Sequence, residues 1–249
     1  MTTTPEVAVI GGSGLYSLID GELTEHDIDT PYGRPSDPVV TGTVAGRPVA
    51  FLPRHGRDHR YPPHKIPYRA NLWALHSLGV RRILAPCAVG GLRPDHGPGT
   101  FVIPDQLVDR TTSRAGTFFD EGAHHTSFGD PYCPAGRAAV LQAADFPVVD
   151  GGTMVVIEGQ RFSTRAESQW YAAQGGTIIN MTGMPEAILA RELGICYTSV
   201  ALVTDHDAGV SAGESVTQEE VFRVFAENTE RMKALILRAV TTWTDAHTC

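Results

Sequence analysis

The segment VAVIGGSGLY, residues 7–16, joins a short β-branched run to a cluster of glycines. This pattern predicts a strand that ends in a tight turn, where backbone N–H groups can hold a small anion. A dinucleotide fingerprint would have a third glycine where Ser17 stands, and a nucleoside triphosphate loop would need Gly-Lys-Ser/Thr. The segment therefore indicates either a plain strand-to-loop turn or one wall of a small phosphate site, with Ser13 supplying a hydroxyl.

Strand-like and helical patterns alternate after this segment. Apolar runs recur at residues 39–44, 49–53, 82–89, 100–108, 153–157, 177–180 and 197–203. Helical spacing of apolar residues is found at 68–79, 164–176, 185–194 and 218–243. The segment TVAGRPV between the second and third runs is typical of a hairpin. We therefore expect one α/β domain over residues 1–249, with a mixed, mostly parallel central sheet flanked by helices.

The composition excludes several classes of protein. The chain has 249 residues and a net charge of −8, which argues against a nucleic-acid partner because such affinity depends on basic surface. No apolar run approaches the roughly 18 residues that span a bilayer. The cysteines are scattered without a C-x-x-C pair, so we expect no disulfide framework and no zinc site; they are Cys87, Cys133, Cys196 and Cys249. A cytoplasmic enzyme or binding protein fits these features.

Polar and glycine-rich segments follow the predicted strands. They read GGSG, RHGRDHR, CAVGGL, EGQRFSTRAE, NMTGMPEA and TDHDAG. Open α/β sheets bind ligands beyond the carboxyl ends of their strands. We therefore expect the functional site at this edge of the sheet.

Three of these segments carry groups that suit one inorganic anion. Arg54 and His55 follow a strand, and Thr182 precedes the helix that begins at Pro185. Arginine offers a planar fork of donors to phosphate oxygens, and a helix start adds free N–H groups. Backbone N–H groups around Ala88 can join them. Each residue alone also fits an ordinary role as a surface charge or an N-cap, but together they favour phosphate.

The segment TDHDAG brings two carboxylates to the same edge. Asp205 and Asp207 leave an apolar strand two residues apart, and a helix-capping or solvent-facing loop is the alternative interpretation. A metal is not expected, because hard cations need several converging oxygens and no further acidic cluster is near. The histidines at 55, 59 and 64 fit no structural zinc spacing.

These segments, in this order from VIGGSGLY to TDHDAG, resemble the trimeric purine nucleoside phosphorylase and methylthioadenosine phosphorylase family. The resemblance implies phosphate-dependent cleavage of the N-glycosidic bond of a purine nucleoside by a homotrimer. It implies no organic cofactor and no metal, since orthophosphate is a co-substrate. The family often has a hydroxyl or amide residue where Cys87 stands, and proline where Gln160 stands.

The resemblance also implies roles for individual residues. Phosphate would be held by Ser13, Arg54, His55, Cys87, Ala88 and Thr182. The nucleoside would contact Met181, Asp205, His206, Asp207, Phe162 and, from a neighbouring subunit, His125. Residues in the segments where the family sets substrate preference are Ser163, Gln218 and Val221, with Val221 expected at the 5′ end.

The chemistry of bond cleavage assigns the two aspartates. A purine leaves when its N7 receives a hydrogen bond or a proton, and we assign that task to Asp205. The N6 amino group of adenine is a donor, so the acceptor Asp207 suits a 6-aminopurine. We therefore expect 5′-methylthioadenosine to yield adenine and 5-methylthioribose 1-phosphate. A phosphorylase acting on 5′-methylthioinosine or a 6-oxopurine nucleoside remains open, as does a non-catalytic NAD-binding module.

Overall fold

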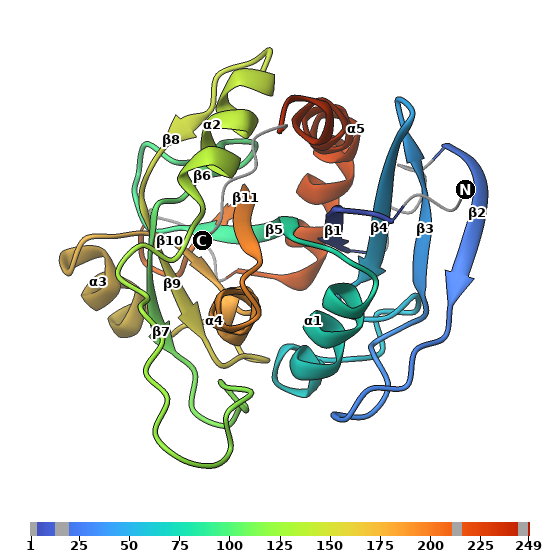
Figure 1. Cartoon of the computed structure of the whole chain (residues 1–249). Helices are drawn as coiled ribbons and strands as arrows, with labels where there is room; N and C mark the ends of the chain where they lie inside the picture. Colours follow the sequence, from blue (N-terminus) through green and yellow to red (C-terminus); the bar gives the residue numbers. More distant parts are fainter. Residues whose placement is uncertain (1–3, 13–19, 211–215, 244–248) are drawn as a thin grey trace.

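A computed structural model describes residues 4–12, 20–210, 216–243 and 249. Its strands join in one sheet with helices on both faces (Figure 1). The main path of the sheet runs through β2 (Asp20–His26), β3 (Val39–Val44), β4 (Arg47–Pro53), β1 (Val7–Gly11), β5 (Arg82–Gly91), β10 (Gly176–Asn180), β9 (Thr153–Ile157) and β7 (Gln106–Arg110). A branch leads from β5 through β11 (Cys196–His206) and β6 (Phe101–Ile103) to β8 (Val149–Asp150).

The sheet is mixed and mostly parallel, as the alternation of patterns predicts. Strand β5 pairs in parallel with both β1 and β11, whereas β3 and β4 form the predicted antiparallel hairpin. Its turn residues Ala45 and Gly46 have φ values of 48° and 78°. Two successive positive φ angles are typical of the type I′ turn, whose twist matches that of the strands it joins.

Helices cover the two faces of the sheet in pairs (Figure 1). The helices α1 (Tyr68–Ser77) and α4 (Gly183–Glu192) share one hydrophobic core, and α2 (Pro134–Ala143) and α5 (Gln218–Thr242) share the other. The remaining described α-helix, α3 (Arg165–Ala173), packs beside β10, and the short 3₁₀ helix η2 (Pro63–Lys65) precedes α1. Apolar side chains on both faces account for the near-continuous hydrophobic runs of the central strands.

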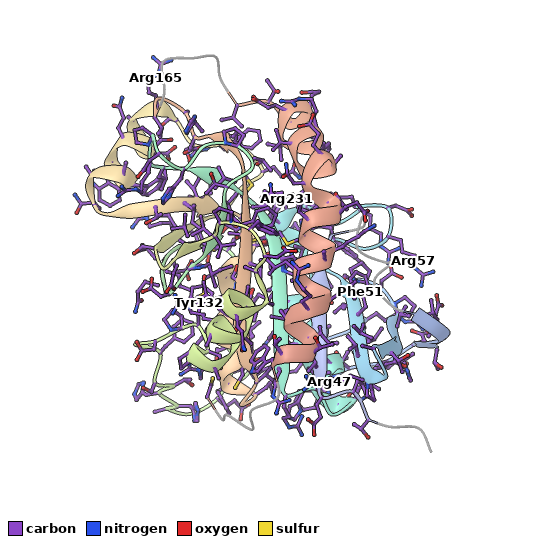
Figure 2. All side chains as sticks on the ribbon, turned by 90° about the horizontal axis from the view of Figure 1, so that it is seen from above. Arg47, Phe51, Arg57, Tyr132, Arg165 and Arg231 are labelled. Atoms are coloured by element: carbon purple, nitrogen blue, oxygen red, sulfur yellow. The ribbon has the colours of Figure 1, made fainter. Side chains whose placement is uncertain are left out.

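The long helix α5 lies along the strands (Figure 2). The guanidinium of Arg231, on α5, lies 5.1 Å from the ring centre of Phe101 and 4.4 Å from that of Phe146. At the end of the helix, Arg47 Nη1 donates to the carbonyl oxygen of Trp243 at 2.7 Å. The Trp243 side chain is itself buried in the core. The second half of α5 is therefore fixed by both apolar packing and hydrogen bonding.

None of the described helices is long and apolar enough to cross a bilayer.

The structure corrects the predicted elements in two places. The run at 100–108 is two strands, β6 and β7, which pair with different neighbours on either side of Pro104. Proline lacks the N–H that a continuous ladder would need. The edge strand β2, the two-residue strand β8 and the helix α2 were not predicted from the sequence. Helix α2 begins after Cys133, whose sulfur accepts from the N–H of Gly136, instead of after a usual N-cap residue.

Three cysteines that are far apart in the sequence meet beside α2. The sulfur atoms of Cys133, Cys196 and Cys249 lie within 4.8 Å of one another, and those of Cys196 and Cys249 are 3.0 Å apart. The cysteines are scattered along the sequence, as the sequence analysis says, but the fold brings these three together. Sequence spacing could not show this, because the thiols come from the N-cap of α2, the first residue of β11 and the far end of the chain.

Packing beside α2 leads to a stability prediction. A Cβ at Gly136 would lie 2.1 Å from Thr198 Oγ1 and 2.6 Å from a ring carbon of Trp243. We therefore expect Gly136→Ala to lower the free energy of unfolding by about 1–3 kcal/mol in urea denaturation, although alanine is the better helix former. The matched control is Gly116→Ala, where a Cβ meets no described atom within 4 Å. Equal stability of the two variants would contradict this account of the packing.

Candidate active site

A cavity of about 400 Å³ opens where the carboxyl ends of five strands meet. Residues that end or follow β1, β4, β5, β10 and β11 form its floor, and the first turns of α5 form one side. This is the edge of the sheet at which the sequence places the functional segments. The predicted site residues that line the cavity are Arg54, His55, Cys87, Ala88, Phe162, Ser163, Met181, Thr182, Asp205, Asp207 and Val221.

Three other predicted site residues do not line the described cavity, and a fourth lies outside the described residues. Ser13 lies outside the described residues, although its neighbour Gly12 is at the cavity wall. His206 points the other way, because its ring lies 3.5 Å from the position that a Cβ of Gly97 would occupy. Gln218 is exposed at the first residue of α5, and His125 is exposed on the segment before α2.

The path of β11 brings Asp205 and Asp207 to the cavity together. Residues two apart in a strand share one face, which puts both carboxylates on one side and His206 on the other. The pairing of β11 with β5 shifts register between Val203 and Asp205, as at a β-bulge, which re-aims the end of the strand. Gly90 of β5 leaves the room for this, since a Cβ there would lie 3.2 Å from Asp205 Oδ2.

Asp205 is placed to carry a proton. Its side chain is buried, and its Oδ1 accepts a hydrogen bond from Thr204 Oγ1 at 2.7 Å. Burial, with a further contribution from the charge of Asp207, raises the pKa of Asp205 to about 6. A carboxyl group that titrates near neutral pH can act as a general acid at the working pH of a cell.

Asp207 is held as a hydrogen-bond acceptor. Its Oδ2 accepts from Ser168 Oγ of α3 at 2.5 Å, and its backbone N–H donates to the carbonyl of Gly91 at 2.9 Å. Burial raises the pKa of Asp207, and the Ser168 hydrogen bond opposes that rise. The hydroxyl of Ser168 fixes Oδ2, and hydrogen bonds from the Ala208 backbone and the Ser163 side chain also lower the pKa of the carboxyl. A carboxylate has about four acceptor sites, so it can receive a further donor from a bound ligand. Nothing in the sequence indicates the contact with Ser168, because that residue belongs to a different element.

The opposite end of the cavity contains the Arg54 side chain. Arg54 Nε and Nη2 donate to the two carboxylate oxygens of Glu186 at 2.8 Å each, and both side chains are buried. Burial lowers the pKa of Arg54, but the charge and hydrogen bonds of Glu186 outweigh it and raise the pKa above its ordinary value. The fork of donors that the sequence assigns to phosphate is thus occupied by Glu186, a residue that sequence reasoning missed.

The start of α4 is arranged by Asn180, which was also missed. Its Oδ1 accepts from the backbone N–H of Thr182 at 2.7 Å and from that of Gly183 at 2.6 Å. The Thr182 side chain makes no capping hydrogen bond to the helix, so Thr182 is the N-cap by position only. Asn180 therefore takes the cap's role, and the Thr182 hydroxyl lies at the cavity wall. An asparagine two residues before a helix is a known turn signal that could have identified it.

His55 lies beside Arg54 in a single tautomer. Its Nδ1 is 2.8 Å from the carbonyl oxygen of Tyr61, and a carbonyl only accepts, so Nδ1 carries the hydrogen. Burial lowers the pKa of His55 to about 3, which keeps the ring neutral at pH 7. The ring stacks on His59 with centroids 4.1 Å apart. His55 Nε2 is therefore an acceptor in the free protein.

Helix α5 gives the cavity an apolar side. Val221, Phe222 and Phe225 line it from the first turns of the helix. The ring of His59 meets that of Phe222 edge to face, with centroids 6.1 Å apart. The Phe222 side chain is 52% exposed, so this side of the cavity is open to solvent in the single chain. An apolar surface here suits an apolar substituent of a ligand.

The wall of the cavity thus has three chemically different regions. One offers an arginine N–H, hydroxyls and backbone groups to an anion, one offers a titratable acid and a fixed carboxylate acceptor, and one is apolar. Such a cavity can hold a small anion below a ligand whose polar ring faces the two aspartates. Its size and its few convergent polar groups are typical of small-molecule sites.

Comparisons with known proteins identify the family of the chain. The sequence profile of the phosphorylase superfamily matches residues 6–241. The purine nucleoside phosphorylase of Streptomyces coelicolor is 59% identical over 247 residues, covering 94% of this chain and 88% of that protein. The S-methyl-5′-thioadenosine phosphorylase of Mycobacterium tuberculosis is 57% identical over 243 residues, covering 98% and 91%. The solved methylthioadenosine phosphorylase of Schistosoma mansoni, in complex with adenine, has a TM-score of 0.90 at 37% identity and covers 95% and 91%.

Proposed function

Because the chain belongs to the phosphorylase superfamily, we propose that it cleaves the N-glycosidic bond of 5′-methylthioadenosine with inorganic phosphate. The products are adenine and 5-methylthioribose 1-phosphate. The observation that carries the choice of substrate is Asp207, a buried carboxylate acceptor that lines the cavity and is held in place by the Ser168 hydroxyl. A relative that is 57% identical bears the same activity in its name.

The reaction breaks one bond and forms another at C1′ of the ribose. The C1′–N9 bond breaks with its electron pair going to the purine, and a phosphate oxygen forms the new bond to C1′. The sugar carbon becomes cationic in between, as in glycoside hydrolysis. Phosphate near Arg54, His55 and Thr182 offsets that charge from below. Asp205 donates its proton toward N7, which stabilises the departing base.

Recognition of the base follows from hydrogen-bond polarity. The N6 amino group of adenine donates a hydrogen bond, and the Asp207 carboxylate accepts it. A 6-oxopurine would place an acceptor against this acceptor, and buried mismatches of that kind discriminate strongly between substrates. Phe162, Ser163 and Met181 line the cavity between the two ends, in keeping with contacts to base and ribose.

The apolar side of the cavity favours a methylthio group at the 5′ position. A 5′-hydroxyl would need polar partners, whereas Val221, Phe222 and Phe225 offer carbon surface. Burial of a methyl group on such a surface is worth on the order of 0.8 kcal/mol. Gln218 lies one turn before Val221 and is a candidate for closing this end when the substrate binds.

A 6-oxopurine nucleoside is the second candidate substrate. It is favoured by the 59% identity to a protein named purine nucleoside phosphorylase. The fold, the phosphate end and Asp205 would serve that substrate equally well. The interaction at Asp207 distinguishes the two bases, and the apolar side of the cavity distinguishes a 5′-methylthio group from a 5′-hydroxyl.

We further propose a cytoplasmic homotrimer that needs no cofactor. The open side of the cavity at Phe222 supports an incomplete site in the single chain. The exposed His125 is our candidate for completing the site of a neighbouring subunit. Phosphate is the co-substrate, and the reaction as written requires no redox step.

Product release from two nucleosides tests the function. We expect adenine from 5′-methylthioadenosine only when phosphate is present, with little hypoxanthine from 5′-methylthioinosine under the same conditions. Chromatography of the free bases measures both. Adenine release without phosphate would contradict phosphorolysis. Hypoxanthine as the preferred product would retain the phosphate chemistry but reverse the assignment of Asp207.

A further inference from the structure

We propose that Glu186 and Tyr197 are positioning residues for phosphate: they fix the Arg54 guanidinium so that one N–H of Nη1 is presented to the anion. The inference rests on the proposed function, because it takes phosphate to bind at the Arg54 end of the cavity. Neither residue lines the cavity, so their effect has to pass through Arg54.

Four hydrogen bonds to three elements fix the guanidinium in its plane. Glu186 of α4 accepts from Nε and Nη2, which prevents rotation about the end of the side chain. The carbonyl of Ile10 in β1 accepts from Nη2 at 2.9 Å, and that of Pro86 in β5 accepts from Nη1 at 3.1 Å. A bidentate carboxylate is the partner that best defines the orientation of an arginine.

Within the part of the chain that the structure describes, these partners leave one donor of Arg54 for a ligand. A guanidinium carries five N–H groups, of which Nε has one and each terminal nitrogen has two. Glu186, Ile10 and Pro86 receive four of them. The fifth belongs to Nη1, and Arg54 lines the cavity. We infer that this fifth N–H is the hydrogen bond that Arg54 gives to phosphate.

Tyr197 orients the Glu186 carboxylate, which in turn orients Arg54. Its hydroxyl, from β11, donates to Glu186 Oε1 at 2.7 Å, so this oxygen accepts from both Tyr197 and Arg54. Burial raises the pKa of Tyr197 well above its ordinary value, which keeps the hydroxyl protonated as a donor. The carboxylate is completely buried, and Tyr197 therefore restricts Glu186 to the orientation that faces Arg54.

The charge of Glu186 allows its positioning of Arg54 to be distinguished from simple electrostatic attraction between Arg54 and phosphate. Among the described residues that line the cavity, Arg54 is the only formal cation, and Glu186 balances its charge. If charge alone governed binding, removal of the negative Glu186 would strengthen binding of phosphate. If orientation governs it, removal of Glu186 weakens binding, because Arg54 loses the partner that aims its fifth N–H. The two accounts predict opposite signs.

The test compares Glu186→Gln with Glu192→Gln. Both residues lie on α4, but Glu192 accepts from Thr117 and the backbone of Phe118, away from the cavity. We expect Glu186→Gln to raise KM for phosphate by about 10- to 100-fold, the range for a lost charge-assisted hydrogen bond. The KM for the nucleoside should change less than about threefold, since Glu186 acts only on the phosphate end. Glu192→Gln should leave both values near those of the parent protein.

Two further variants separate positioning from structural damage. Glu186→Asp keeps the carboxylate and should recover part of the phosphate affinity. Tyr197→Phe should raise KM for phosphate in the same direction by a few fold, whereas Tyr132→Phe, at the neighbouring ring 6.1 Å away, should not. If Glu186→Gln does not fold, Tyr197→Phe against Tyr132→Phe decides the question.

The outcomes distinguish this inference from the proposed function. Unchanged or lowered KM for phosphate in folded Glu186→Gln, or in Tyr197→Phe, would overturn the positioning role while leaving phosphorolysis intact. Calorimetric titration of the parent protein with inorganic phosphate supplies the other arm. A parent protein that neither binds nor requires phosphate would overturn the proposed function and this inference together.

Discussion

Replacing Asp205 by asparagine is expected to lower kcat/KM for 5′-methylthioadenosine by about 10²- to 10⁴-fold, the range for loss of a general acid. Asparagine fits the same space and can still donate a hydrogen bond to N7, but it cannot transfer a proton. The loss should therefore appear mainly in kcat, because the interaction matters most as the base departs. Steady-state rates of adenine release at saturating phosphate measure it.

The pH dependence provides a second readout for the same residue. In the proposed mechanism the protonated form of Asp205 is the active one. The pKa of Asp205 in the protein without ligand is about 6. Its protonated fraction falls as the pH rises through that value, so kcat/KM should fall by about tenfold per pH unit on the alkaline side. In Asp205→Asn this limb should disappear, since the amide does not titrate.

A matched substitution controls for loss of charge. Asp109 is exposed on β7 and accepts from the backbone of Thr111, away from the cavity. Asp109→Asn should retain the rate and the pH profile of the parent protein. An Asp205→Asn variant that keeps its full rate, or keeps the limb near pH 6, would remove Asp205 as the acid.

The second large effect concerns the choice of base. We expect Asp207→Asn to change the ratio of kcat/KM for 5′-methylthioadenosine to that for 5′-methylthioinosine by about 100-fold or more in favour of the inosine compound. The asparagine oxygen can keep the hydrogen bond from Ser168, which turns its NH₂ group toward the base. That NH₂ group donates to the O6 of a 6-oxopurine and opposes the N6 donor of adenine.

Competition between the two nucleosides in one reaction measures the ratio directly. The KM for phosphate should stay within about twofold, because Asp207 lies at the other end of the cavity from Arg54. A loss of rate with both substrates and no change in their ratio would show that Asp207 supports the site without reading the base. An unchanged ratio at full activity would place base recognition on another residue.

Most of the residues that line the cavity could be predicted from the sequence, because they stand in local segments at one edge of the sheet. The glycine turn, the Arg-His pair, the Thr182 segment and the two aspartates each follow a strand, and parallel strands bring their carboxyl ends together. His206 is instructive, since the alternation of side chains along a strand already places it opposite Asp205 and Asp207. The resemblance of the TDHDAG segment implied a substrate contact for His206, but the alternation of side chains turns this residue away from the cavity.

The parts that escaped prediction depend on contacts between distant elements. Glu186 resembles an ordinary acidic residue in the first turn of a helix, and nothing in its neighbours shows that Arg54 lies against it, 132 residues away in sequence. Ser168 and the cysteine cluster are hidden for the same reason. Helix α2 lacked a usual N-cap, and the strands β2 and β8 are an edge strand and a two-residue strand with little pattern to detect.

Helix α5 divides its length between two tasks, and this division bears on how such an enzyme can change over evolutionary time. Val221, Phe222 and Phe225 meet the cavity on one face near its start, while Met232 and the residues after it are fixed in the core. Under the proposed function, substitutions on that first face would adapt the pocket to a different 5′ group without disturbing the aspartates at the end of β11 or the anion end at Arg54. We therefore expect new sugar preferences to be accessible in single steps, each leaving the residues proposed for bond cleavage unchanged.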